Sequence, residues 1–243
     1  MTSTFLWALA GTQFIFLMTT LGASLVFFLR SSAPRFQTVL PGFAGGVMAA
    51  ASVWSLLLPA IEQINAEGQL PAWLPAAAGL VLGTLFLTAA DALQGGARGR
   101  DRMLFTAITL HNIPEGMAVG LAFALAADGE GLAAALALAL GIGIQNFPEG
   151  AAISLPMRKA GESRWRSFMG GMLSGIVEPI FGVAVVLAAA SAGALMPWLL
   201  SFAAGAMLYV VVEELVPQSN TRGGVSGFMA GFLVMMILDV ALG

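Results

Sequence analysis

Long apolar stretches dominate this chain and constrain its fold more than any other feature. A helix crosses the hydrocarbon core of a bilayer with about 20 consecutive apolar residues. We expect such helices over eight ranges, roughly 5–29, 38–62, 71–94, 103–127, 131–157, 167–190, 196–217 and 224–242. The connections between them are short. The sequence therefore predicts an all-α polytopic membrane protein whose single transmembrane domain covers 1–243.

The composition excludes the main soluble classes. Only 9% of the residues are charged, whereas a soluble domain carries roughly 25%. The net charge of -3 gives no basic surface for nucleic acid, so the expected partner is the lipid bilayer. Cysteine is absent, which removes disulfides and thiolate metal ligands.

The basic residues predict the orientation of the helices in the membrane. All ten follow the first, third, fifth or seventh span: Arg30, Arg35, Arg98, Arg100, Arg102, Arg158, Lys159, Arg164, Arg166 and Arg222. The other connections contain no Lys or Arg. Cytoplasmic loops attract basic residues. We therefore expect a protein of the cell inner membrane with both termini outside.

Glycines repeat at a spacing of four residues in several spans. The pairs are Gly42/Gly46, Gly79/Gly83, Gly171/Gly175 and Gly227/Gly231. Both members of a pair lie on one helix face and let neighbouring backbones approach closely. We favour ordinary helix packing over a moving or ligand-lining interface.

Two polar motifs interrupt the fourth and fifth spans near their middles. His111-Asn112-Ile113-Pro114-Glu115-Gly116 and Gln145-Asn146-Phe147-Pro148-Glu149-Gly150 repeat one pattern. Residues i and i+4 share a helix face, so the first and fifth members of each motif project together. Each proline frees a backbone carbonyl, which lipid tolerates only beside a polar cavity. The following glycine leaves room for close approach.

The sixth span adds another buried carboxylate in Glu178-Pro179. An ionisable group at membrane depth costs at least about 2.5–3.5 kcal/mol. No Lys or Arg lies within a span, so Glu115, Glu149 and Glu178 either hold protons or share a cation. Imidazole, carboxylate and amide oxygen together suit a divalent transition metal, and zinc best. A hydrogen-bonded packing role for His111 and a proton relay are the alternatives.

Further acidic residues lie near the ends of the spans. Asp91, Glu213 and Glu214 are expected on the inner side. They form either an inner exit site for a cation or solvated helix ends, and the sequence favours neither. For Glu62 and Asp239, near the outer ends of their spans, we favour plain solvation over a role in cation entry.

The paired motifs closely resemble those of the ZIP (Zrt/Irt-like) divalent metal transporters. The resemblance covers the whole chain, and Ser174-Gly-Ile-Val-Glu-Pro179 and Glu213-Glu-Leu-Val-Pro217 also fit. The second motif, which starts with Gln145, and the double Glu are most similar to the bacterial GufA-like branch.

The resemblance implies a binuclear metal site at mid-membrane. One metal would be held by His111, Glu115, Gln145 and Glu149, and a second by Asn112, Asn146 and Glu178, with Glu115 and Glu149 bridging the two. Some relatives carry a second imidazole where this chain has Gln145, which implies a softened affinity or a changed selectivity. Some carry an Asp where it has Asn146, and the amide lowers the negative charge that would hold the second metal.

The function that the resemblance implies is uptake of Zn²⁺ into the cytoplasm by alternating access. Cd²⁺, Fe²⁺ and Mn²⁺ are further candidate substrates, and relatives suggest a homodimer. An intramembrane metalloenzyme and a proton- or sodium-coupled solute carrier are the competing functions. A zinc enzyme usually has two or three imidazoles, whereas this chain has one His. A solute carrier would need aromatic or Arg anchors, and the spans hold no Arg.

Overall fold

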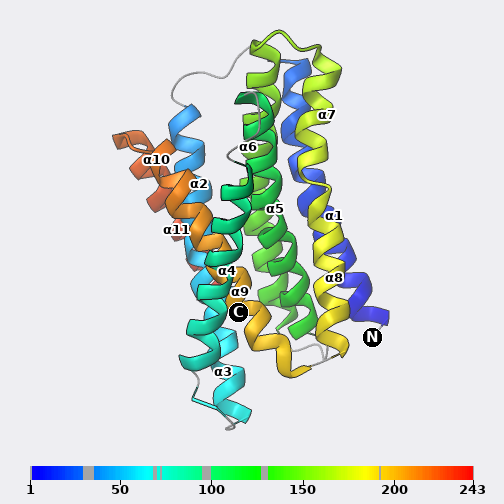
Figure 1. Ribbon diagram of the computed structural model, residues 1–243, viewed down its shortest axis with the longest axis vertical. Helices are drawn as coiled ribbons and strands as arrows, with labels where there is room; N and C mark the ends of the chain where they lie inside the picture. Colours follow the sequence, from blue (N-terminus) through cyan, green and yellow to red (C-terminus); the bar gives the residue numbers. More distant parts are fainter. Residues whose placement is uncertain are drawn as a thin grey trace.

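Helices make up every regular element in the part of the chain that the structure describes (Figure 1). This computed structural model describes residues 2–29, 36–67, 70–71, 73–94, 100–126, 131–191 and 193–242. The side chains of Asp91 and His111 lie outside the described part. The helices are α1 Thr2–Ser24, α2 Phe36–Ala51, α3 Leu58–Glu67, α4 Trp73–Gln94, α5 Arg100–Leu125, α6 Leu132–Lys159, α7 Arg164–Ser174, α8 Val177–Ser191, α9 Met196–Val210, α10 Val216–Gln218 and α11 Arg222–Leu242.

Seven stretches of the described part are long and apolar enough to cross a membrane. They are Phe5–Phe27, Thr38–Ala66, Trp73–Ala90, Leu132–Lys159, Arg164–Ala188, Met196–Gln218 and Arg222–Ala241. Each coincides with one of the predicted spans. The predicted span 103–127 corresponds to α5, whose Asn112–Leu125 portion is apolar but shorter. An eighth crossing through α5 therefore stays a prediction.

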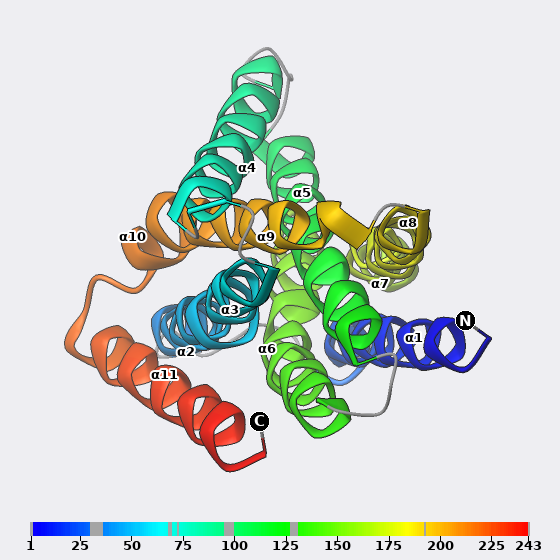
Figure 2. The ribbon, with the colours of Figure 1, turned by 90° about the horizontal axis from the view of Figure 1, so that it is seen from below.

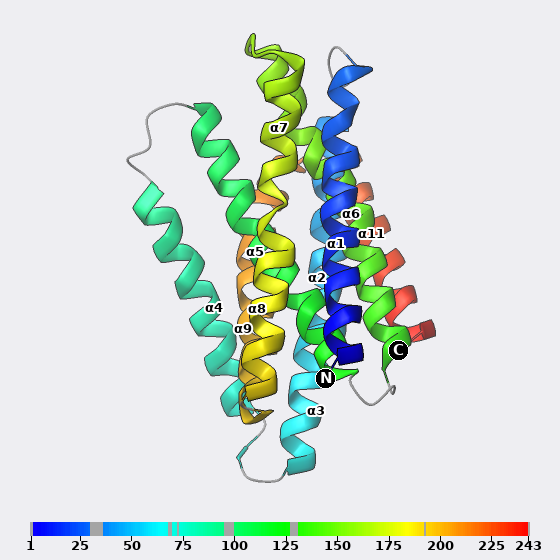
Figure 3. The same cartoon turned by 90° about the vertical axis from the view of Figure 1, so that its right-hand side faces the viewer.

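Both chain ends lie at the same end of the helix bundle, as Figures 1 and 3 show. The turn between α6 and α7 lies at the opposite end, where Gly161 takes a left-handed φ of 104°. Arg158, Arg164 and Arg166 are exposed beside this turn. A chain that crosses a membrane an even number of times has both ends on the same side, and this arrangement fits that.

The helices form two groups, and in Figure 2 α2 and α11 of one lie at the left while α1 and α8 of the other lie at the right. In the first, α2 packs on α11 and α4 packs on α9; we call this group, with α3 and α10, the α2 bundle. In the second, α1 packs on α6 and α5 packs on α8; with α7 it forms the α6 bundle. The two bundles meet mainly where α5 contacts α9 and where α6 contacts α2 and α11.

Glycines hold the helices of the α2 bundle close together. A Cβ on Gly42 would overlap with the backbone of Gly224 on α11, and one on Gly231 with the backbone of Phe43 on α2. On α4, a Cβ on Gly83 would meet the Phe202 carbonyl of α9. These glycines therefore serve helix packing, as predicted.

Glycines of the α6 bundle make equally close contacts. A Cβ on Gly116 would overlap with the Glu178 carbonyl, and one on Gly150 with the Thr19 carbonyl. The last residue of each polar motif therefore brings its helix against a third helix, α8 or α1. Across the boundary between bundles the contact is softer, because Gly141 of α6 meets the flexible side chain of Met235.

Two spans of the α2 bundle contain a π-helical turn. The first, η2, is Ser52–Leu57 between α2 and α3, and the second, η4, is Val211–Leu215 between α9 and α10. Each ends two residues before a proline, Pro59 or Pro217. A proline ring clashes with the carbonyl four residues earlier. The wider π turn, in which the Leu58 N–H reaches the Val53 carbonyl, accommodates that clash.

Candidate metal centre

The two polar motifs lie on neighbouring helices of the α6 bundle. Both α5 and α6 continue as helices through Pro114 and Pro148. Asn112, Glu115, Gln145 and Asn146 have no solvent exposure. Glu149 is half-buried one helical turn beyond Gln145. The site residues of α5 and α6 whose side chains are described thus lie in the interior of the helix bundle.

Glu178 reaches the same region from a break in the sixth predicted span. That span is divided into α7 and α8 at Gly175 and Ile176, which corrects the expectation of one continuous helix. Pro179 has no N–H for the Gly175 carbonyl, which instead accepts the Glu178 N–H at 3.0 Å. Glu178 is therefore in the first turn of α8, where the helix dipole stabilises a negative side chain.

The break also leaves a carbonyl available at the end of α7. In a continuous helix the Ser174 carbonyl would accept the N–H of Glu178, which is engaged elsewhere. The Nδ2 of Asn112 donates to this carbonyl at 3.0 Å. The proline next to Glu178 therefore positions an amide of the first motif as well.

Hydrogen bonds from the other amides join the helices that carry the carboxylates. Gln145 Nε2 donates to Glu115 Oε1 at 2.5 Å, which joins α6 to α5. Asn146 Nδ2 donates to Glu178 Oε1 at 3.1 Å, which joins α6 to α8. The first of these bonds brings the two motifs into contact at Gln145 and Glu115.

The atoms without a hydrogen-bond donor share one chemical character. Each is an oxygen with lone pairs, buried within the described part: Asn112 Oδ1, Glu115 Oε2, Gln145 Oε1, Asn146 Oδ1, Glu149 Oε2 and Glu178 Oε2. Buried polar atoms are normally hydrogen-bonded. The six predicted site residues thus present six buried acceptors without hydrogen-bond donors, and a bound cation would satisfy them.

The charges of the site have the same sign. The Glu149 carboxyl is close enough to Glu115 and Glu178 to repel both. Every Lys and Arg of the sequence lies outside the two motifs and the Glu178 segment. Within the described part, no three His, Cys, Asp or Glu side chains are arranged to hold a metal ion by themselves. The amide oxygens of Asn112, Gln145 and Asn146 add three buried, unpaired acceptors to those of the carboxylates.

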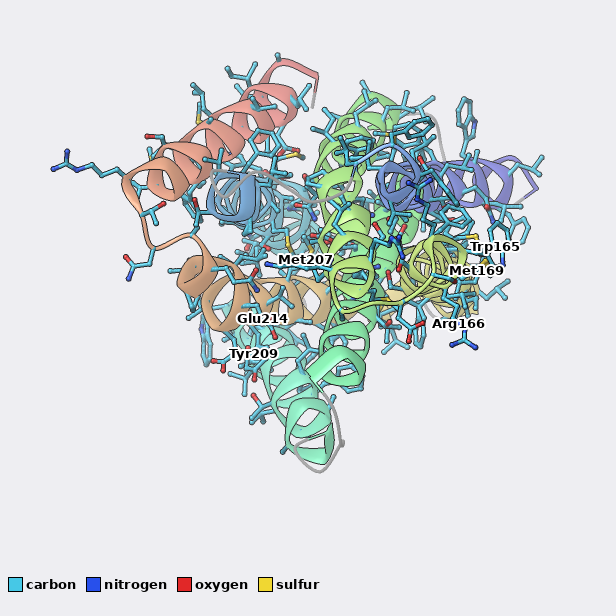
Figure 4. All side chains as sticks on the ribbon, turned by 90° about the horizontal axis from the view of Figure 1, so that it is seen from above. Trp165, Arg166, Met169, Met207, Tyr209 and Glu214 are labelled. Atoms are coloured by element: carbon cyan, nitrogen blue, oxygen red, sulfur yellow. The ribbon has the colours of Figure 1, made fainter. Side chains whose placement is uncertain are left out.

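The other predicted ligands lie elsewhere or outside the described side chains. His111 belongs to α5 and Asp91 to α4, but neither side chain is described. Glu213 is exposed on η4, and Glu214 is half-buried and accepts from Gln218 Nε2 at 3.3 Å. Figure 4 shows Glu214 on the α2 bundle, well apart from Arg166 on α7. An inner exit site stays a prediction.

Sequence reasoning missed one residue of the site, Thr19 on α1. Its hydroxyl is fully buried and donates to Glu178 Oε1 at 3.0 Å. The only signal in the sequence is a polar residue within an apolar span. That signal is weak because a helical Thr can bond to its own backbone, and Thr19 Oγ1 is also 3.2 Å from the Ile15 carbonyl.

Asp239 differs from its prediction. We expected plain solvation, but its side chain is buried and its Oδ1 accepts from Ser55 Oγ at 2.6 Å. The bond joins α11 to the π-helical turn η2. Glu62, by contrast, is exposed as expected.

Known proteins match this chain over nearly its full length. A sequence model of the family described as ZIP zinc transporter matches residues 93–239. The chain is 36% identical to "Zinc transporter ZIP11" of Bos taurus, over 97% of each chain. It is 39% identical to "Zinc transporter GufA" of Myxococcus xanthus over 97% of this chain and 96% of the relative. It is 38% identical to "Zinc transporter ZIPB" of Bordetella bronchiseptica over 98% of this chain and 82% of the relative.

Proposed function

Because the chain belongs to the ZIP family of zinc transporters, we propose that the six buried oxygens between α5, α6 and α8 bind the cation it transports. The family and the named relatives are transporters, so the metalloenzyme alternative is wrong. One observation carries the proposal: the six buried polar atoms of the site that lack a hydrogen-bond partner are all carboxylate or amide oxygens, and none is an N–H or O–H donor. A neutral or anionic solute would instead require donors facing it.

Zinc is the proposed substrate, and Cd²⁺, Fe²⁺ and Mn²⁺ are further candidates. Three carboxylates and three amide oxygens give hard ligands, and His111 would add a nitrogen. The ligands divide over two positions. Glu115, Gln145, Glu149 and His111 would hold one cation, and Asn112, Asn146 and Glu178 the other, with Glu115 and Glu149 shared.

Alternating access is the proposed mechanism, with the two bundles as the moving parts. The six donor-free oxygens of the site all belong to the α6 bundle. Contacts between backbones at glycines support each bundle internally, whereas Met235 supplies a flexible contact between them. Movement of the α6 bundle along the α2 bundle would expose the site to each side in turn, and Asp91, Glu213 and Glu214 would receive the cation on the inner side.

The proposed direction is into the cytoplasm, across the inner membrane. It rests on eight crossings with both termini outside, for which the exposed basic residues at the α6–α7 turn are the support. A homodimer is proposed from the resemblance alone.

The test is uptake of zinc-65 by proteoliposomes that contain the purified protein. Glu149→Gln keeps the shape of the side chain but removes its charge, and Glu149→Ala removes the ligand. We expect uptake to fall at least tenfold in both, about 1.4 kcal/mol or more of lost interaction. Glu62→Gln, an exposed carboxylate on α3, is the matched control. Wild-type uptake in both Glu149 variants would contradict the proposal.

A further inference from the structure

The carboxylate of Glu178 uses its two oxygens differently. Oε1 accepts two hydrogen bonds, from Thr19 Oγ1 at 3.0 Å and from Asn146 Nδ2 at 3.1 Å. Oε2 has no donor. With both lone pairs of Oε1 engaged, only Oε2 remains free to bind a cation.

Thr19 is held rigidly in the position from which it donates. On one side, Gly150 lets α6 approach so closely that a Cβ there would overlap with the Thr19 carbonyl. On the other, a Cβ on Gly175 would lie 3.1 Å from both the Thr19 side chain and Glu178 Oε1. Packing at two glycines therefore fixes the hydroxyl against Glu178, although α1 contributes none of the predicted ligands.

The number of carboxylate oxygens that bind affects which cation fits. Zinc takes about four ligands in a tetrahedral arrangement. A larger divalent cation such as Ca²⁺ takes about six to eight oxygens and can bind both oxygens of a carboxylate. A carboxylate that offers one oxygen therefore favours the smaller ion.

We propose that Thr19 is a positioning residue that determines metal specificity: its hydroxyl, together with the Asn146 amide, holds Glu178 as a single-oxygen ligand and so favours zinc over larger divalent cations. This rests on the proposed function of the site as the place where the transported cation binds. It assigns a role to a helix that carries neither of the paired motifs.

The test compares two variants of Thr19 in competition uptake of zinc-65 against Cd²⁺, a larger ion of the same charge. Thr19→Val removes the hydroxyl at nearly constant volume and frees a lone pair of Glu178 Oε1. We expect the ratio of the KM values for zinc and cadmium to shift about tenfold toward cadmium. Thr19→Ser keeps the hydroxyl and is expected to keep the wild-type ratio.

Thr12→Val is the matched control on the same helix. Thr12 is also fully buried, but its Oγ1 donates within α1, to the Ala8 carbonyl at 2.8 Å. A second measurement does not need transport. The shift in Tm that added zinc causes in each detergent-solubilised variant is divided by the shift that added cadmium causes. A purely structural role for Thr19 would lower Tm and maximal uptake but leave both ratios unchanged.

Three results would overturn the inference: an unchanged ratio in Thr19→Val, a failure of Thr19→Ser to preserve it, or an equal shift in Thr12→Val. Each leaves the proposed function intact if uptake still depends on Glu149. Uptake that is independent of Glu149 would instead contradict the proposed function.

Discussion

At the scale of single residues, the amide side chains have two tasks in the site. Each amide has a donor nitrogen and an acceptor oxygen. The nitrogens of Asn112, Gln145 and Asn146 all donate to protein oxygens, and their own oxygens have no donor. The same side chains thus orient the surrounding groups and add ligands without adding charge.

Replacing Gln145 tests this double role. Gln145→Leu removes the donor to Glu115 Oε1 and one of the six free oxygens. Because a hydrogen bond to a charged group contributes about 1.5–3 kcal/mol, we expect the KM for zinc uptake to rise at least tenfold. Gln13→Leu, an exposed amide on α1, should leave the KM unchanged. An unchanged KM in Gln145→Leu would show that this amide neither binds the cation nor orients Glu115.

At the scale of helices, prolines determine where the spans depart from regular α-helix. Pro59 and Pro217 follow π-helical turns, and Pro179 follows the break between α7 and α8. Pro114 and Pro148 leave α5 and α6 continuous. The break before Pro179 places Glu178 in a first helical turn and releases the Ser174 carbonyl for Asn112.

Pro179→Ala tests the value of that break. Alanine supplies the missing N–H to the Gly175 carbonyl, so α7 and α8 can join and move Glu178 away from Thr19. We expect zinc uptake to fall at least tenfold while Tm stays equal or rises, because proline costs little in a first turn and a joined helix would gain the backbone bonds that the break interrupts. Pro156→Ala, at an exposed position on α6, is the control. Full uptake in Pro179→Ala would mean that the break is not needed for function.

The sequence predicted the parts of the site that depend on spacing along one helix. The repeated motifs, the shared face within each motif and the glycine packing follow from helical periodicity, and the structure confirms the packing at Gly42, Gly83 and Gly231. The contact of Thr19 with Glu178 depends on how α1 packs on α8, which no local pattern encodes. The helix break and the burial of Asp239 likewise depend on partners distant in the sequence.

At the scale of the whole molecule, helices pack more tightly within each bundle than they do between the two bundles. Within each bundle, backbone meets backbone at glycines, so sliding would create overlaps. Where α6 meets α2 and α11, Gly141 contacts side chains of Val47 and Met235. The boundary between bundles is therefore the place where motion costs least.

Disulfide cross-links test this difference in a chain that contains no cysteine of its own. A Cβ on Gly141 would lie 3.7 Å from Val47 Cγ1, so Gly141→Cys with Val47→Cys can join the two bundles. Oxidation should then stop zinc uptake, and reduction should restore it. The control pair is Val39→Cys with Gly223→Cys, because a Cβ on Gly223 would lie 3.2 Å from Val39 Cγ2 and both residues belong to the α2 bundle. This pair should transport zinc whether oxidised or reduced. Equal uptake by the oxidised inter-bundle pair would exclude motion at this boundary.

The central claim is that the donor-free oxygens between α5, α6 and α8 bind the transported metal. Anomalous diffraction at the zinc edge, from crystals of the protein grown with zinc, tests it most directly. We predict anomalous peaks about 2.0–2.2 Å from carboxylate oxygens of Glu115, Glu149 and Glu178, weakened in Glu149→Gln. Zinc bound only at other positions, or no peak between these helices at saturating zinc, would contradict the claim.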